Sequence, residues 1–230
     1  MGRVALFVFL AVAARAQRAP VLVELFTSEG CSSCPPADAL LQTLDADVVV
    51  LSEHVDYWDQ LGWRDPNSSH EFTARQERYG RILGVEVYTP QLVVDGREAV
   101  IGNQVDAVRA AIGRAKSRPH EAVRIESARR EGGEAVVAVS IPPMTKGKAE
   151  VWVGVAAETT RSEVRHGENS GRTLTHIVVL RSLTKAGIAD HATTFDRMVR
   201  VPAAPEGSRV VVFLADSGGQ MHGAASVRLP

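Results

Sequence analysis

Two cysteines, Cys31 and Cys34, constrain this chain more than any other feature, because they are the only cysteines among its 230 residues. They follow an apolar run, Val21–Phe26, that predicts a buried strand, and they precede an apolar pattern, Ala37–Leu41, that is typical of a helix. A spacing of two residues places both sulfur atoms at the first turn of that helix, where unpaired amide groups favour a thiolate over a thiol. A strand, a Cys-x-x-Cys pair and a helix form the layout of a centre for dithiol–disulfide exchange.

The N-terminus predicts a secretory signal peptide over residues 1–16. Gly2-Arg3 gives a short positive start, residues 4–14 are apolar but too few to span a bilayer, and Ala14-Arg15-Ala16 offers a small-x-small cleavage site. The alternative is a membrane anchor that stays uncleaved. No later stretch of sequence is long and apolar enough for a transmembrane helix. We therefore expect a periplasmic or secreted protein with no membrane span after cleavage, in a compartment that permits disulfides.

Charge and cysteine count narrow the classes of function. The chain has 26 basic and 27 acidic residues with no basic patch, so we expect no nucleic-acid partner. Two cysteines cannot form a disulfide scaffold, and a bridge that closes so small a loop adds little chain-entropy stabilisation. A redox-active disulfide is therefore favoured over a structural or residual bridge. It needs no other cofactor, and its expected partners are protein thiols or disulfides in the exported compartment.

Residues 20–118 alternate between strand and helix signals. A polar and aromatic loop follows the second predicted strand, and the dipeptide Asp95-Gly96 between two apolar runs predicts a hairpin. The order is strand, helix, strand, helix, strand, strand, helix. The corresponding segments are residues 21–26, 36–44, 47–55, 68–79, 91–94 and 99–101, followed by a last helix that opens at Asn103.

That order, with Cys-x-x-Cys after the first strand, resembles the thioredoxin superfamily in its shorter, glutaredoxin-like form. In that superfamily a cis proline precedes the third core strand and faces the cysteines, so the resemblance implies that the Thr89-Pro90 bond is cis. The sequences of the segments Phe26–Asp38 and His54–Trp58 resemble those of a narrower family of exported bacterial proteins, filed as domain of unknown function 1223. The resemblance implies the fold and the dithiol.

After residue 118 the pattern changes to β-branched runs separated by Gly, Pro and polar turns. Strands at this spacing without intervening helices predict an antiparallel β-sandwich over residues 119–230. This second domain has no cysteine, so we expect it to select partners rather than to catalyse. The predicted strands are residues 122–125, 135–141, 149–157, 174–180, 194–201 and 209–215.

At the cysteine pair we expect Cys31 to be the nucleophile and Cys34 the resolving thiol, because superfamily members expose the first sulfur. Pro35 and Pro36 fit early helical positions, where a missing amide proton costs least. They also bias Cys34 away from the α conformation. Glu24, a carboxylate inside an apolar strand, can take a proton from the resolving thiol if burial raises its pKa; the alternative is a strand-edge glutamate that faces water.

The loop after the second strand supplies further candidates. Thr89 with Tyr57 and Trp58 is expected to bind substrate, with Pro90 holding backbone groups against the incoming chain; simple loop packing is the alternative for the aromatic residues. His54 offers a competing function. Together with the two thiolates it could complete a zinc or copper site, which would make the protein a periplasmic metal-binding domain or copper chaperone.

Two other histidines, His166 and His176, flank a Gly-rich turn that predicts a hairpin loop. We interpret both as ordinary surface residues.

Overall fold

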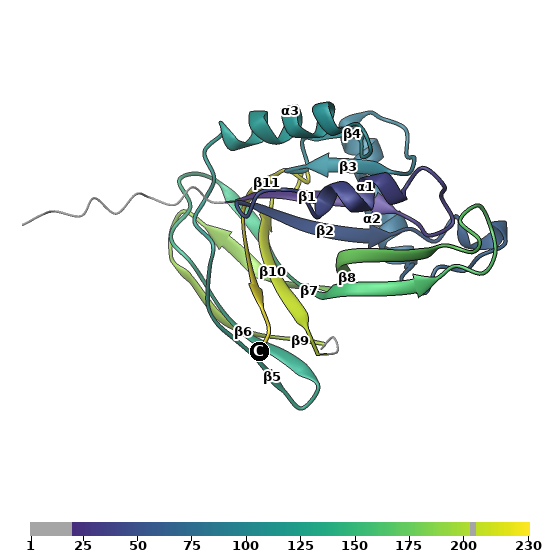
Figure 1. The fold of residues 1–230 in the computed structure, drawn as a ribbon. Coiled ribbons are helices and arrows are strands. Elements are labelled where there is room, and N and C mark those ends of the chain that lie inside the picture. Colours follow the sequence, from purple (N-terminus) through teal and green to yellow (C-terminus); the bar gives the residue numbers. More distant parts are fainter. Residues whose placement is uncertain (1–19, 203–205) are drawn as a thin grey trace, which may run out of the picture.

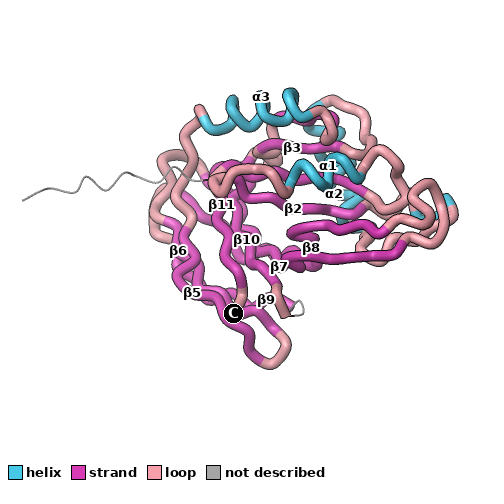
Figure 2. Tube along the Cα trace, in the orientation of Figure 1, coloured by secondary structure: helices cyan, strands magenta, loops and turns pink. Residues whose placement is uncertain are grey.

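The computed structural model describes residues 20–202 and 206–230. The expected signal peptide lies outside the described residues. Two sheets form the architecture, a mixed sheet of eight strands and a separate antiparallel sheet of three. Figure 1 shows the α-helices beside one part of the larger sheet, and Figure 2 shows that the rest of the described chain is mostly strand and loop. Within the described residues, no helix is long and apolar enough to cross a membrane.

The first half follows the predicted order of elements. β1 is followed by a short helix that starts at two prolines, and the β3–β4 hairpin turns through Asp95 and Gly96, both with positive φ. Ser69 caps α2, where its hydroxyl accepts a hydrogen bond from the amide of Glu71, so the helix starts later than the predicted residue 68. The elements are β1 (Val21–Thr27), α1 (Pro35–Leu41), β2 (Val48–His54), η1 (Asp59–Leu61), α2 (His70–Leu83), β3 (Gln91–Val94), β4 (Glu98–Ile101) and α3 (Val105–Lys116).

The second half consists of strands alone, as predicted, but contains one strand more than expected. Two of these strands are far longer than their apolar runs and form one long hairpin whose tip spans residues 164–172. The strands are β5 (Arg124–Glu131), β6 (Glu134–Ile141), β7 (Lys148–Glu163), β8 (Thr173–Asp190), β9 (Phe195–Pro202), β10 (Ser208–Ala215) and β11 (Met221–Arg228).

The larger sheet joins the two halves. Its strand order is β11-β10-β7-β8-β2-β1-β3-β4, so β8 lies beside β2. Those two strands run parallel and meet at one paired position, Ser52 with Val179. The sheet is therefore continuous across the boundary that the sequence indicated near residue 118.

Three layers of buried apolar side chains stabilise this arrangement. One lies between β1, β3 and the helices α1 and α3. A second covers the opposite face and mixes both halves of the chain: Phe26 and Leu51 share it with Leu180 and Phe213. A third fills the space between the three-stranded sheet β5-β6-β9 and the β7–β10 part of the large sheet. The second half is thus sandwich-like in its layers, but one of its two sheets is the same sheet that carries β1.

Candidate functional site

The structure joins Cys31 and Cys34 in a disulfide at the junction of β1 and α1. Both residues are 0% exposed. Pro35 and Pro36 occupy the first helical positions, as predicted, but the expected bias on Cys34 is wrong. Cys34 is the N-cap residue and has α-helical angles, φ −76° and ψ −40°, so its carbonyl accepts the first helical hydrogen bonds, from Ala37 and Asp38.

The loop after β2 and the turn before β3 meet the cysteine loop. The Thr89-Pro90 bond is cis, and Pro90 is buried. The indole Nε1 of Trp58 donates to Oγ1 of Thr89 at 2.8 Å, and Trp58 also packs against Gly30, the residue before Cys31. Trp58 therefore connects Thr89, the residue before Pro90, to the cysteine loop. The neighbouring Tyr57 is partly buried against the core beneath this loop.

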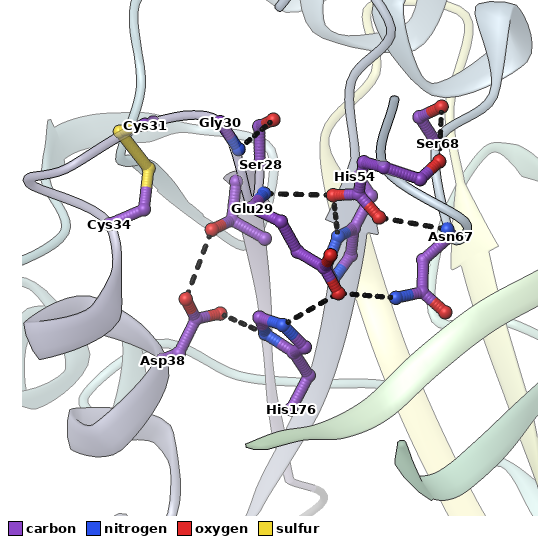
Figure 3. A network of polar contacts seen from close by, with 12 residues as sticks. Ser28, Glu29, Gly30, Cys31, Cys34, Asp38, His54, Asn67, Ser68 and His176 are labelled. Carbon is purple, nitrogen blue, oxygen red and sulfur yellow. Dashed lines mark hydrogen bonds and ion pairs between the residues drawn. A yellow bond between two sulfur atoms is a disulfide. The ribbon is translucent and has the colours of Figure 1, made fainter. Parts of the chain in front are cut away.

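Beneath the disulfide lies a buried group of charged side chains that the sequence did not indicate (Figure 3). His176 from β8 lies between two carboxylates: its Nδ1 is 3.3 Å from Asp38 and its Nε2 is 3.4 Å from Glu29. Asp38, one helical turn after Cys34, also accepts a hydrogen bond from Oγ1 of Thr27 at 3.2 Å. The prediction that His176 is a surface residue is wrong, since it is 1% exposed, whereas His166 is exposed as expected.

His176 is the cation that balances this group. Burial alone would lower the pKa of His176, but its contacts with Asp38 and Glu29 raise that pKa to about 10, from 6.5 for an ordinary histidine. The imidazole is therefore protonated at neutral pH. Without its proton, two carboxylates would face each other across a buried space with no compensating charge, which is costly in a protein interior.

A histidine–aspartate pair, His54 with Asp65, extends this buried group away from the cysteines. Nδ1 of His54 is 2.6 Å from Asp65, and the His54 ring meets the His176 ring edge-to-face at 4.5 Å. Burial alone would raise the pKa of Asp65, but the charge of His54 and its hydrogen bond lower it to about 2. Asp65 in turn accepts the amide of Glu29 at 2.8 Å, which fixes the start of the cysteine loop.

The metal site that combined His54 with the two cysteines is not formed in this oxidised structure. The cysteines are bonded to each other and His54 is paired with Asp65. Across residues 20–202 and 206–230, no group of three or more His, Cys, Asp or Glu side chains is arranged to hold a metal ion.

Glu24 is buried, as its interpretation as a proton acceptor required. Its contacts, however, are with residues of α2 and not with the expected partner, Cys34. Arg75 from α2 contacts its carboxylate at 2.6 Å, and the hydroxyl of Tyr79 donates to it at 2.6 Å. Burial, together with the neighbouring Glu24 charge, raises the pKa of Glu53 well above its usual value. The carboxylate that shares a network with the cysteine helix is therefore Asp38, while Glu24 belongs to an ion cluster at α2.

The tip of the β7–β8 hairpin completes the site. Asn169 is fully buried, and its Nδ2 donates to the carbonyl of Glu29 and to the carbonyl of Cys31, both at 2.9 Å. The exposed carboxylate of Glu168 accepts the amide of Ser32 at 2.9 Å. From the opposite side, Nδ2 of Asn103 donates to the carbonyl of Ser33 at 3.3 Å, which is a use other than the helix cap expected of it.

His176 and Asp38 carry a sequence signal, but it can be recognised only once the bounds of the strand and the helix are known. Leu174, His176 and Val178 alternate along β8 and share its buried face. Asp38 follows Cys34 by four residues and so lies on the same side of α1. Asn169 has no such signal, because it lies in an irregular turn.

The fold and the site define a mixed α/β protein in which a Cys-x-x-Cys disulfide is enclosed by residues from both halves of the chain. The family model for "Protein of unknown function (DUF1223)" matches residues 22–215, and the chain belongs to this family. The structure is similar to the crystal structure of protein AGR_C_4864 from Agrobacterium tumefaciens, with 31% sequence identity, a TM-score of 0.71, and coverage of 92% of this chain and 94% of that one. No curated protein matches the sequence.

Proposed function

We propose that this protein is an exported thiol–disulfide oxidoreductase with a thioredoxin-like centre, and that it exchanges the Cys31–Cys34 disulfide with partner proteins. The observation that carries the proposal is the placement of the only two cysteines, bonded to each other between β1 and α1 in the part of the molecule that also holds the cis Thr89-Pro90 bond. A structural bridge that closes so short a loop would add little stability. The proposed periplasmic or secreted location rests on the signal-like N-terminus.

The exchange proceeds through a mixed disulfide. A thiolate of the partner attacks Sγ of Cys31, a partner–Cys31 bond forms, the Cys31–Cys34 bond breaks, and Cys34 leaves as a thiolate. A second thiolate of the partner then attacks the partner's own sulfur, so that the partner leaves as a disulfide and Cys31 as a thiolate. Two electrons pass to this protein, and the reverse sequence returns them.

Local contacts support this assignment of roles. Oγ of the exposed Ser33 lies 3.4 Å from Sγ of Cys31, where its hydroxyl can donate to a thiolate. Asp38 lies one turn beyond Cys34 on α1, and the amide of Asp38 donates to the carbonyl of Cys34 at 3.1 Å. We assign Asp38, rather than Glu24, the role of accepting the proton that the Cys34 thiol loses when it resolves a mixed disulfide.

A turnover assay with a disulfide-bonded protein substrate tests the proposal. We expect the wild-type protein, reduced beforehand with excess dithiothreitol that is then removed, to reduce the substrate, and Cys31→Ala to be inactive. Cys34→Ala should instead accumulate a covalent complex with the substrate through Cys31. Equal inactivity of the wild type and Cys31→Ala in both the reducing and the oxidising direction would refute the proposed activity.

A further inference from the structure

The loop that carries the disulfide is bound by a part of the chain that lies far from it in sequence. Both cysteines are 0% exposed, although Ser32 and Ser33 between them are exposed. The hairpin tip, residues 164–172, contacts this loop from β7 and β8. Thiol–disulfide exchange requires a thiolate to reach a sulfur atom, so its rate depends on access. In the closed arrangement neither sulfur is open to a thiolate in solution.

Most of the hydrogen bonds between the tip and the cysteine loop come from one side chain, that of Asn169. Asn169 donates to two backbone carbonyls, those of Glu29 and Cys31, and its own carbonyl oxygen accepts from Arg172 at 2.7 Å. Glu168 adds a bond to the amide of Ser32. The tip is also ordered within itself, because Val164 and Arg172 are paired through their backbones at 2.9 Å. It can therefore move as a unit when these bonds to the loop, and the packing of Gly167 against Trp63, are released.

We propose that Asn169 is a specificity-determining residue, which locks the hairpin tip over the disulfide so that small thiols are excluded and only a protein partner that displaces the tip reaches Cys31. This inference rests on the proposed exchange activity. The partner class follows from the contacts that are lost on opening. The carbonyl of Glu29 needs a new donor, and that of Cys31 retains only the amide of Cys34. An extended protein segment can supply backbone amides to both, whereas a small thiol such as dithiothreitol has no amide with which to replace these bonds.

Reduction of the oxidised protein by dithiothreitol tests this directly. The wild-type rate should reach a plateau as the dithiothreitol concentration rises, because opening of the tip becomes limiting. At low dithiothreitol concentration, where the rate is proportional to the open fraction, Asn169→Ala should be reduced about tenfold faster, since net loss of roughly one hydrogen bond shifts the closed–open equilibrium by about that factor. The matched control is Ser170→Ala: this exposed neighbour bonds only within the tip, to the carbonyl of Arg165, and should behave as wild type.

A second variant keeps the test decisive if Asn169→Ala fails to fold. Glu168→Gln weakens the other anchor at an exposed side chain and should accelerate reduction by a smaller factor. Equal rates for the wild type and both variants, or a wild-type rate that rises linearly to the rate of the urea-unfolded chain, would overturn the inference. Turnover of a protein substrate is measured separately. If turnover is absent while small-thiol rates respond to Asn169→Ala, the proposed activity fails but the restriction of access by the hairpin tip stands. If turnover is present while small-thiol rates do not respond, only the restriction of access by the tip is refuted.

Discussion

Replacing His176 with Gln should destabilise the folded protein in a manner that depends on pH. His176 is the only cation in contact with Glu29 and Asp38 among the described ion pairs, and all three side chains are buried. Removing one partner of a buried charge group typically costs about 3–5 kcal/mol, because the charges left behind are uncompensated. We therefore expect a loss of this order near neutral pH.

The pKa of His176 fixes how that loss changes with pH. A pKa of about 10 in the folded protein, against 6.5 for an ordinary histidine, is equivalent to about 5 kcal/mol in favour of the imidazolium. Between these two values the folded state holds a proton that the unfolded state has lost. The stability that His176 contributes is thus fully present below the unfolded pKa and falls as pH rises toward the folded pKa, by about 1.4 kcal/mol per pH unit.

The assay is urea unfolding of the oxidised wild type and of His176→Gln at about pH 7.5 and about pH 9.5, where the difference in free energy of unfolding should shrink by about 2.5 kcal/mol. Groups that titrate equally in both proteins cancel in this difference, and the disulfide-bonded cysteines do not titrate. His166→Gln, which changes an exposed histidine of the same hairpin, is the control and should show no effect. A difference that stays constant between the two pH values would refute the assignment of a buried imidazolium.

Three further outcomes follow from the packing. Gly96→Ala should cost about 3 kcal/mol or more in urea unfolding, because its new Cβ would overlap the carbonyl oxygen of Gly219 across the seam between the halves, whereas Gly132→Ala, also at positive φ but in open space, should cost only about 1 kcal/mol. Arg75→Met should lose about 3–5 kcal/mol at neutral pH and regain part of it in acid, where the buried carboxylate of Glu53, whose pKa is raised by burial, takes up a proton; equal losses at both pH values would contradict this. A chain that ends at residue 118 should fail to give a cooperative unfolding transition, and a stable, cooperative fragment would show that the shared core is dispensable.

Local patterns predicted the first half well because its elements carry their own signals. Apolar runs of the right length, an Asp-Gly turn and an early pair of prolines each specify one element, and their order placed the cysteines between β1 and α1. The cis bond at Pro90, by contrast, came only from the resemblance to a superfamily. β11, Met221–Arg228, was missed because its residues are mostly small or polar and form no β-branched run.

The contact between β2 and β8 could not be predicted for a different reason. It consists of one paired position, Ser52 with Val179, between strands separated by more than half the chain, and a pairing so distant leaves no periodic pattern. The polar ends of β7 and β8 were equally hidden, since the alternating exposed residues Thr159, Arg161 and Glu163 lack the apolar signal of a buried strand. With the hairpin unpredicted, the positions of Asn169 and His176 at the disulfide could not be inferred.

Asn169 and His176 give the second half of the chain a structural role at the disulfide. A unit formed by β1 to α3 alone would hold Glu29 and Asp38 beneath the disulfide without their compensating cation, and it would leave the carbonyl of Glu29 without the donor that Asn169 supplies. Unpaired buried charges and acceptors each oppose folding. The cysteine loop is therefore stable in its observed form only when β7 and β8 are docked against β2. Partner selection, which the sequence alone assigned to a separate docking domain, would then occur at the disulfide itself, through the strands that complete its surroundings.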